Sequence, residues 1–306
     1  MKNVDCVIVT YNRLDLLKEC IKSVLEQTYP INKIFVIDNN SKDETWPYLQ
    51  QIKYKYSNII PIHVKKNVGG AGGFNIGIKE FIKSSNSDFV WLMDDDTIPS
   101  KYALENLIKH HNEKNIGFLS SNVRWKDGNP ASMNIPSPTE DWNIHANNGL
   151  IKIKSASFVS ILFPRTTINK VGYPIKDFFI WGDDMEFTLR ITQAYKLDGY
   201  MVNDSLVEHK IKSNIGTNII EEKDINRISR YYYDRRNTIF YLKKYEGKKQ
   251  LVKTFIKQLV IDPTKIMFKS PNHKSKRLAT SLKGTMAGIF FKPNIEKIEK
   301  DKNIKN

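Results

Sequence analysis

Apolar and polar residues follow two different patterns along the N-terminal third of the chain. Short runs rich in Val, Ile and Phe, typical of buried strands, occupy residues 4–10, 33–38, 59–64 and 89–93. Between these runs, apolar residues recur at three-to-four spacing, which predicts helices over residues 14–25, 46–52 and 74–82. Strands that alternate with helices predict an α/β fold with a mostly parallel central sheet flanked by helices.

In a sheet of this kind, functional groups collect at the carboxyl ends of the strands. Polar segments follow strands at residues 11–13, 38–41, 67–75 and 94–96, so we expect the functional residues among them. The Ser-, Pro- and Asn-rich stretch 129–148 predicts a long surface loop of the kind that serves as a lid or binding loop. From residue 224 the pattern is helical throughout. We therefore predict an α/β domain over residues 1–212 and a helical region over residues 213–306.

The composition is that of a globular protein. Of 306 residues, 40% are hydrophobic and 26% charged, which excludes a disordered chain. No run reaches the roughly 18–20 apolar residues that cross a bilayer, and the first residues lack the apolar stretch of a signal peptide. Two cysteines, Cys6 and Cys20, cannot form a disulfide framework, so we expect a reducing, cytoplasmic environment.

The positive charge is concentrated at the C-terminal end. Residues 248–306 hold 15 Lys or Arg and four acids, so they carry +11 of the net +15. Such a tail suggests an anionic partner surface, either nucleic acid or acidic lipid headgroups. Leu, Ile, Phe and Met recur among these lysines at helical spacing, which suits a helix lying in a membrane interface. The alternative is an ordinary charged helical cap on the α/β domain.

Three consecutive aspartates, Asp94, Asp95 and Asp96, end the fourth predicted strand. Alternate side chains of an extended backbone share a face, so Asp94 and Asp96 should converge while Asp95 points away. Two carboxylates on one face suit Mg²⁺ or Mn²⁺ with coordination positions open to substrate phosphates. The competing interpretation is a solvated acidic turn that caps the following helix.

The glycine-rich segment 67–75 precedes a predicted helix. It has neither the Gly-Lys-Ser/Thr of a nucleoside triphosphate loop nor a G-x-G-x-x-G after the first strand. Its backbone could approach an anionic ligand at the helix N-terminus, or it could be a tight strand-to-helix turn.

A second acidic cluster comprises Asp183, Asp184 and Glu186, flanked by Trp181 and Phe187. One acid would suffice to cap a helix, whereas a partly desolvated carboxylate is a usable general base. His209 follows another strand-like stretch and is a candidate third metal ligand, although an isolated histidine is more often structural.

Taken in order, these blocks resemble the inverting glycosyltransferases of the GT-A fold, family 2. The resemblance spans residues 4 to about 210 and rests on VIVTYNR, FVIDNNSKDET, NVGGAGGFNIG, WLMDDDTIP and FIWGDDMEF followed by His209. Together with YYYDRRN at residues 231–237, the blocks look most like the galactofuranosyltransferase-type branch. One departure is that Gly182 separates Trp181 from the paired acids, whereas in that branch the tryptophan directly precedes them.

The resemblance implies a role for most of the candidate residues. Asp94, Asp96 and His209 would bind Mn²⁺ or Mg²⁺ at the donor diphosphate. Asp184 would be the general base, with Asp183 beside it. Nucleotide contacts would come from Tyr11, Arg13, Asp38, Asn67 and Asp95, and diphosphate or acceptor contacts from Trp181, Glu186, Arg235 and Arg236.

The implied substrates are a nucleotide-sugar donor, most simply a UDP-sugar, and a glycan or lipid-linked acceptor. UDP-galactofuranose is the expected donor, with rhamnosyl or other hexosyl transfer as the alternative. The implied setting is bacterial cell-surface polysaccharide synthesis at the inner face of the membrane. The rival from another class is a nucleic-acid-binding protein, which would leave both acidic clusters unexplained, and we expect no nucleic-acid partner. A nucleotidyltransferase is the rival among enzymes.

Overall fold

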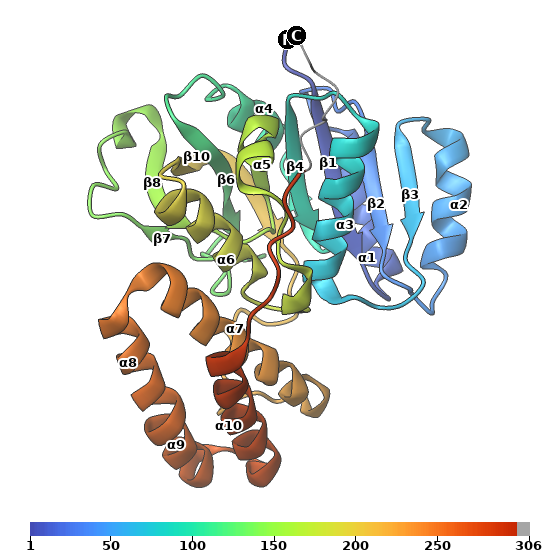
Figure 1. Ribbon diagram of the computed structural model, residues 1–306. Coiled ribbons are helices and arrows are strands. Elements are labelled where there is room, and N and C mark those ends of the chain that lie inside the picture. Colours follow the sequence, from blue (N-terminus) through green and yellow to red (C-terminus); the bar gives the residue numbers. More distant parts are fainter. Residues whose placement is uncertain (299–306) are drawn as a thin grey trace.

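The computed structural model describes residues 1–298, which form a large mixed sheet with helices on both faces and a helical unit below one edge (Figure 1). The strands are β1 (Val4–Thr10), β2 (Ile34–Asp38), β3 (Ile59–His63), β4 (Phe89–Asp94), β5 (Thr97–Pro99), β6 (Ile116–Arg124), β7 (Ser137–Pro138), β8 (Leu150–Ser155), β9 (Ile161–Pro164) and β10 (Asp198–His209). The helices of the α/β part are α1 (Leu14–Leu25), α2 (Thr45–Lys55), α3 (Gly69–Ser84), α4 (Ala103–Ile108), α5 (Arg165–Val171) and α6 (Asp183–Leu189). The predicted α/β class is confirmed.

The strand order is β3-β2-β1-β4-β9-β6-β10-β8-β7, with β5 paired to the end of β10. Strands β1 to β4 run parallel to one another, as the alternation of strands and helices predicted. Beyond β4 the sheet is mixed, because β9 is antiparallel to both β4 and β6. Thr10 lies opposite Asp38, and Val9 opposite Asp94, so the carboxyl ends of β1, β2 and β4 form one edge.

The glycine-rich segment forms the start of α3 and allows it to pack tightly on the sheet. A Cβ atom on Gly73 would lie 2.5 Å from Val9, and one on Gly77 would lie 2.3 Å from Val7. Gly69 has φ +74° and lies directly against the backbone of Phe179. Close approach of the backbone therefore accounts for these glycines without a bound phosphate.

The helical unit comprises α7 (Tyr231–Tyr241), α8 (Lys248–Ile256), α9 (Asp262–Lys269) and α10 (Lys274–Phe290). Helix α10 lies directly on α7 because Gly284 and Gly288, one turn apart, face its backbone. After α10 the chain runs back along the α/β part, where Glu296 forms ion pairs with Lys79 and Lys176 (Figure 1). The unit is thus attached to the α/β part at both of its ends. No helix within residues 1–298 is long and apolar enough to cross a bilayer.

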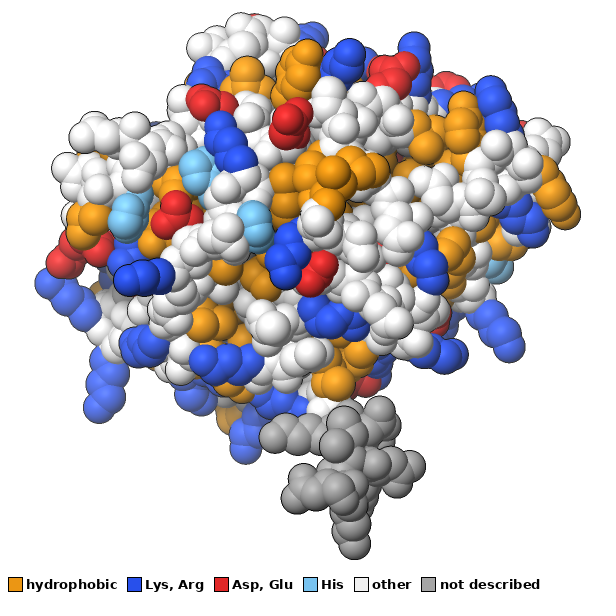
Figure 2. Space-filling view, turned by 90° about the horizontal axis from the view of Figure 1, so that it is seen from above, with side chains coloured by type: hydrophobic (Ala, Val, Ile, Leu, Met, Phe, Trp, Pro, Cys, Tyr) orange, Lys and Arg blue, Asp and Glu red, His pale blue; other side chains and the backbone are white. Residues whose placement is uncertain are grey.

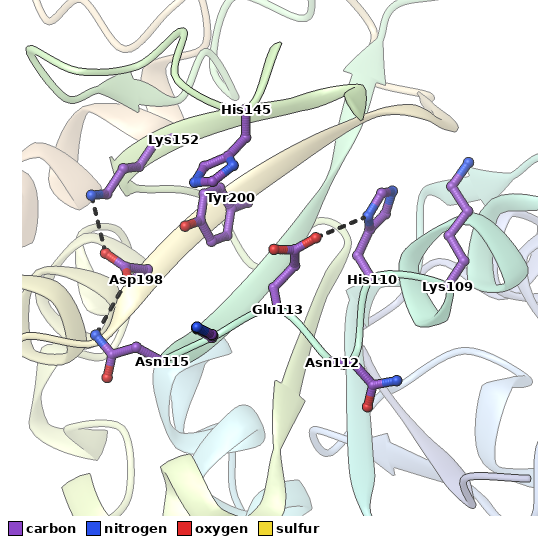
Figure 3. Close-up of a pocket in the computed structure, with 10 residues that line it drawn as sticks. Lys109, His110, Asn112, Glu113, Asn115, His145, Lys152, Asp198 and Tyr200 are labelled. Atoms are coloured by element: carbon purple, nitrogen blue, oxygen red, sulfur yellow. Dashed lines mark hydrogen bonds and ion pairs between the residues drawn. The ribbon is translucent and has the colours of Figure 1, made fainter. Parts of the chain in front are cut away.

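The amino-terminal ends of the strands form the opposite end of the molecule. This face mixes apolar, basic and acidic side chains (Figure 2). A hollow of about 550 Å³ lies beside the starts of β6 and β10 (Figure 3). Two close pairs of side chains line it, Lys152 with Asp198 (3.3 Å) and His110 with Glu113 (3.8 Å). The hollow is remote from the edge described next.

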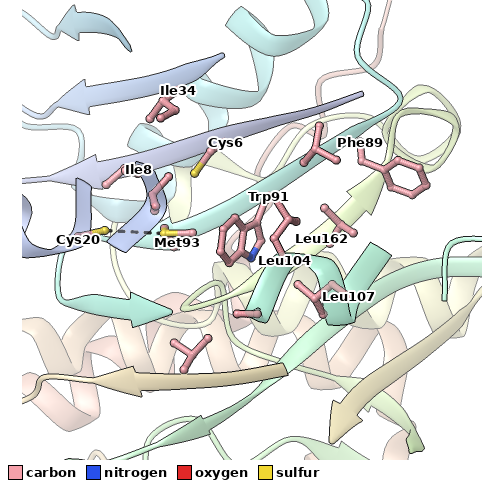
Figure 4. Packing of buried hydrophobic residues seen from close by; sticks show 14 of the residues in the cluster. Cys6, Ile8, Cys20, Ile34, Phe89, Trp91, Met93, Leu104, Leu107 and Leu162 are labelled. Atoms are coloured by element: carbon pink, nitrogen blue, oxygen red, sulfur yellow. Dashed lines mark hydrogen bonds between the residues drawn. The ribbon is translucent and has the colours of Figure 1, made fainter. Parts of the chain in front are cut away.

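The core is divided between the two faces of the sheet. Alternate residues of β1 enter different clusters, Cys6 and Ile8 on one face, Val7 and Val9 on the other. Trp91 of β4 lies at the centre of the first cluster, where its indole N–H donates to Ser160 (2.9 Å) (Figure 4). Both cysteines are buried and free.

Candidate active site

The carboxyl end of β4 carries Asp94, Asp95 and Asp96, and β5 follows immediately. Strand β5 pairs antiparallel with the end of β10, which places His209 opposite Thr97 and hence beside Asp96. The His209 Nε2 atom lies 3.1 Å from Asp96 Oδ1. One ligand atom from each of Asp94, Asp96 and His209 fits within a span of 4.8 Å. Strand pairing therefore unites residues more than a hundred positions apart in the sequence.

The middle aspartate is not part of this cluster, and Asp95 and Asp96 lie in a turn, not in the extended backbone that the sequence suggested. Asp95 accepts a hydrogen bond from Thr10 Oγ1 (2.8 Å) and another from the Tyr11 amide (3.3 Å). Arg13 lies between the two carboxylates, with its Nη1 atom 3.2 Å from Asp95 and 2.6 Å from Asp96. Asp95 thus joins the end of β1 to the end of β4, and Arg13 supplies part of the balancing charge.

The three carboxylates titrate differently. Burial and the negative charge of Asp96 raise the pKa of Asp94 to about 7, and burial raises the pKa of Asp95 to about 6. Although burial opposes its ionisation, the hydrogen bond and charge of His209 hold the pKa of Asp96 below its usual value. A set of two carboxylates and an imidazole, with excess negative charge nearby, is suited to a divalent cation.

The paired acids Asp183 and Asp184 begin α6, after Gly182 in the left-handed conformation (φ +85°). Asp183 is buried, and Asp184 is half-buried and accepts a hydrogen bond from the Met185 amide (2.7 Å). Burial raises the pKa of Asp184 to about 6. Burial raises the pKa of Asp183 well above its usual value, and the charges of Asp184 and Asp94 raise it further. The two acidic clusters therefore lie close enough to interact electrostatically.

Helix α7 holds the turn that carries these acids. Asn237 is fully buried and donates hydrogen bonds to the carbonyls of Phe178 (3.0 Å), Ile180 (3.3 Å) and Trp181 (2.7 Å). Trp181, itself at φ +61°, packs edge-on against Tyr231. The helical unit thereby fixes the backbone from which Asp183 and Asp184 project.

Three residues expected at the site are engaged elsewhere. Glu186 is fully buried, and its carboxylate pairs with Arg190 and accepts a hydrogen bond from Tyr245 (2.6 Å). Arg235 forms an ion pair with Asp262 (2.7 Å) inside the helical unit. Arg236 donates to the Asp177 carbonyl (2.6 Å) and stacks on Phe291. Their side chains pack the helices together instead of facing the open edge of the sheet.

The residues expected at the nucleotide differ in accessibility. Tyr11 is exposed at the end of β1. Asn67 accepts a hydrogen bond from the Gly69 amide (2.8 Å) and so shapes the turn before α3. Asp38 is fully buried, with one oxygen accepting from the Ser41 amide (3.0 Å) and the other 2.7 Å from His63 Nδ1. The structure therefore gives Asp38 no oxygen open to a base.

Two residues at the site carry no signal in the sequence. Asn134, in the long loop, lies with its side-chain oxygen 2.7 Å from His209 Nδ1. Arg230 is exposed, and partial burial together with the positive charges of Arg227 and Arg13 lowers its pKa, so its guanidinium lies within electrostatic range of Arg13. Only the fold brings these side chains to the edge, since neither lies within a motif.

Comparison with known proteins assigns the chain to a family. Residues 5–171, more than half of the chain, match the family described as Glycosyl transferase family 2. The protein belongs to this family, and its fold is the GT-A fold.

Named relatives are more distant. The chain is 26% identical over 195 residues to glycosyltransferase AglE of Haloferax volcanii, covering 62% of each protein. It is 24% identical over 205 residues to galactofuranosyltransferase GlfT1 of Mycolicibacterium smegmatis, covering 62% of this chain and 66% of that protein. The matches thus span less than two thirds of these relatives' lengths.

Solved structures show the same fold at low identity. GalNAc-T7 with UDP, GalNAc and Mn²⁺ superposes with a TM-score of 0.59 at 14% identity, over 83% of this chain and 54% of that one. The mannosyltransferase PcManGT of Pyrobaculum calidifontis, in complex with GDP-Man and Mn²⁺, superposes with a TM-score of 0.57 at 14% identity. The superposition covers 94% of this chain and 75% of that one.

Proposed function

We propose that the protein is a metal-dependent inverting glycosyltransferase that moves a sugar from a nucleotide donor to a glycan or lipid-linked acceptor. The observation that carries this proposal is the cluster of Asp94, Asp96 and His209 within electrostatic reach of the pair Asp183 and Asp184. One group suits a cation and the other a base, and both lie near the edge where strands β1, β2 and β4 end. Mn²⁺ in two structural neighbours supports Mn²⁺, with Mg²⁺ as the alternative.

In this mechanism Asp94, Asp96 and His209 would hold the cation. When bound, the divalent ion supplies Lewis-acid neutralisation of the charge that develops on the departing diphosphate. Arg13 adds a positive charge at the same edge, and Arg230 is the exposed guanidinium near it. These two residues replace Arg235 and Arg236 in our assignment of diphosphate contacts, and Tyr11 remains the candidate for nucleotide stacking.

Asp184 would take the proton of the acceptor hydroxyl. Its pKa of about 6 leaves it ionised at neutral pH, yet makes it a stronger base than an unperturbed carboxylate. Single displacement with inversion needs no protein nucleophile. Asp183 would modulate the charge of its neighbour, because two carboxylates this close do not ionise independently.

UDP-galactofuranose is our proposed donor, because the likeness to GlfT1 agrees with the motif pattern. Other relatives bear names of different sugar transferases, including a UDP-Glc-dependent β-1,3-glucosyltransferase of Escherichia coli, so hexosyl donors form the comparison set. We further propose cell-surface polysaccharide synthesis at the cytoplasmic face of the membrane, with residues 1–212 as the catalytic domain and a helical region from residue 213 on, of which residues 299–306 lie outside the described part of the chain.

A donor screen tests the proposal. Purified protein with Mn²⁺ and a total glycan extract is offered UDP-galactofuranose, UDP-galactose, UDP-glucose and dTDP-rhamnose, and released nucleoside diphosphate is measured. We expect release with a UDP-sugar, loss of release in EDTA, and no pyrophosphate from any nucleoside triphosphate. Activity that persists in EDTA would refute the metal site, and pyrophosphate release would indicate the nucleotidyltransferase.

A further inference from the structure

The helices α8 and α9, with the π turn Lys257–Ile261 between them, expose a group of apolar side chains to solvent. Phe268 is 82% exposed and Val260 59% exposed. Exposed apolar groups of this density mark an interaction surface in a folded protein. We call the group the apolar helical face: Val252, Ile256, Leu259, Val260, Ile261, Met267 and Phe268.

Exposed lysines alternate with these apolar residues along the same helices, and they include Lys249, Lys253, Lys265 and Lys269. The one acidic residue between positions 247 and 290 is Asp262. It is buried and forms ion pairs with Arg235 and Lys257, each at 2.7 Å. The surface therefore combines apolar groups with uncompensated positive charge.

Helices α8 and α9, which carry the apolar helical face, belong to the helical unit drawn below the sheet (Figure 1). The face at the far end of the molecule differs, because there acidic and basic side chains are interspersed (Figure 2). Binding through α8 and α9 would turn the side of the molecule that carries the catalytic edge toward whatever the helices bind.

We propose that the apolar helical face docks on an anionic lipid bilayer. Apolar side chains of an amphipathic helix enter the acyl boundary, and lysines beside them interact with acidic headgroups, each contributing roughly 1 kcal/mol near the surface. Nucleic acid offers phosphates but no apolar environment for Phe268 and Val260. A second copy of the chain would bring two sets of lysines together, which opposes self-association.

Vesicle co-sedimentation of the full chain tests this. We expect binding to vesicles of phosphatidylcholine with 30% phosphatidylglycerol, weak binding to pure phosphatidylcholine, and weakening by salt. The double variant Lys249→Glu/Lys253→Glu should bind at least about tenfold more weakly. Val260→Ser/Phe268→Ser should also bind more weakly, because it removes inserted apolar area.

The matched control is Lys55→Glu/Lys83→Glu, which makes the same change in net charge on exposed lysines at the ends of α2 and α3. It should bind like the unaltered protein, and circular dichroism should show all variants folded. Equal binding by the helical and control charge variants would overturn the proposal. So would dimerisation or duplex RNA binding through this face without any vesicle binding.

A second inference concerns Asn134, whose place is determined by independent contacts. Its side-chain oxygen lies 2.7 Å from His209 Nδ1, and its amide group donates to Ser157 Oγ (2.9 Å). Nearby, the Ser132 amide donates to Asn214 Oδ1 (2.7 Å), so the segment after β10 holds the loop in place. The loop is thus fixed where it touches the imidazole.

We infer that Asn134 is a positioning residue for His209. A side-chain amide oxygen only accepts, so Asn134 favours a proton on Nδ1 and turns Nε2 toward Asp96, to which Nε2 donates in the metal-free protein. Loss of the Nε2 proton alone then gives the neutral imidazole that binds a cation. The inference rests on the metal site of the proposed function.

Mn²⁺ titration in the presence of UDP, followed by the electron paramagnetic resonance signal of free Mn²⁺, tests this role. Asn134→Leu should bind Mn²⁺ about 10–100-fold more weakly, and Asn134→Asp, which keeps an acceptor oxygen, should restore affinity. The matched control is Asn129→Leu. Asn129 lies on the same loop, and within residues 1–298 its side-chain hydrogen-bond partner is Asp127, not a residue of the metal site. A purely structural role would lower thermal stability without changing Mn²⁺ affinity.

Unchanged affinity in Asn134→Leu, with Mn²⁺ binding by the unaltered protein, would overturn this inference and leave the proposed function intact. Failure of the unaltered protein to bind Mn²⁺ would overturn both.

Discussion

At the scale of single residues, the two acidic clusters differ in how their charge is balanced. Asp96 contacts both Arg13 and His209 and has a lowered pKa, whereas Asp184 has a backbone amide as its partner and a pKa raised to about 6. A carboxylate with a cationic partner is held ionised, while one that is buried without a cation is a stronger base. This difference supports the assignment of separate roles to the two clusters.

Asp184→Asn should lower kcat by roughly a hundredfold to ten-thousandfold while donor affinity stays near normal, because the amide cannot accept the hydroxyl proton. Steady-state kinetics and UDP binding by calorimetry, measured on the same preparation, separate these effects. Gln193→Ala, beyond α6, is the control and should retain activity. An equal loss of donor affinity in Asp184→Asn would argue against the base assignment.

Without a divalent ion, the protein should lose stability as the pH rises. Asp94 has a folded pKa of about 7, and Asp95 and Asp184 of about 6, against an ordinary value of 3.8. The folded state therefore binds these protons more tightly than the unfolded state, and stability that is present below pH 3.8 is lost as the pH passes through the folded pKa values.

Urea unfolding in EDTA between about pH 4 and pH 7 measures this slope. The free energy of unfolding should fall across the interval, and Asp95→Asn should make the fall shallower. A free energy that rises with pH would contradict the pKa directions.

At the scale of elements, the catalytic turn depends on packing between parts of the chain that are distant in sequence. The turn before α6 contains residues with positive φ, Phe179 and Trp181, followed by Gly182. Strained backbone of this kind persists only where its surroundings hold it. Here Asn237 of α7 supplies the hydrogen bonds.

Asn237→Ala should destabilise the protein by about 1–3 kcal/mol, since it leaves buried carbonyls without a donor. It should also lower kcat, because Asp183 and Asp184 project from the released turn. Urea denaturation and initial rates measure the two effects. Asn226→Ala, an exposed site in the short helix before α7, is the control. Full activity in Asn237→Ala would show that the turn does not depend on α7.

At the scale of the whole molecule, a ligand that bridges the strand ends should stabilise the complete fold. At a hundred times its Kd, UDP with Mn²⁺ adds about 2.7 kcal/mol to the free energy of unfolding. Differential scanning fluorimetry should show a higher Tm with both ligands than with either alone. Asp96→Asn should remove this gain, and an unchanged gain would exclude Asp96 as a ligand.

The sequence alone determined which residues lie at the strand ends. The alternation of apolar runs with helical spacing set the order of strands and helices through β4, and the apolar strand before the three aspartates set their place at the edge of the sheet. These are local properties, so the sequence expresses them directly.

Only the tertiary structure decided which distant groups meet. Pairing of β5 with β10 carried His209 to Asp96, the loop brought Asn134 to His209, and the helical unit placed Arg230 near Arg13. The tertiary structure also places Glu186, Arg235 and Arg236 in internal ion pairs and hydrogen bonds. The reason is physical: a charged side chain far along the chain is equally compatible with an open site or a buried partner, and packing selects between them.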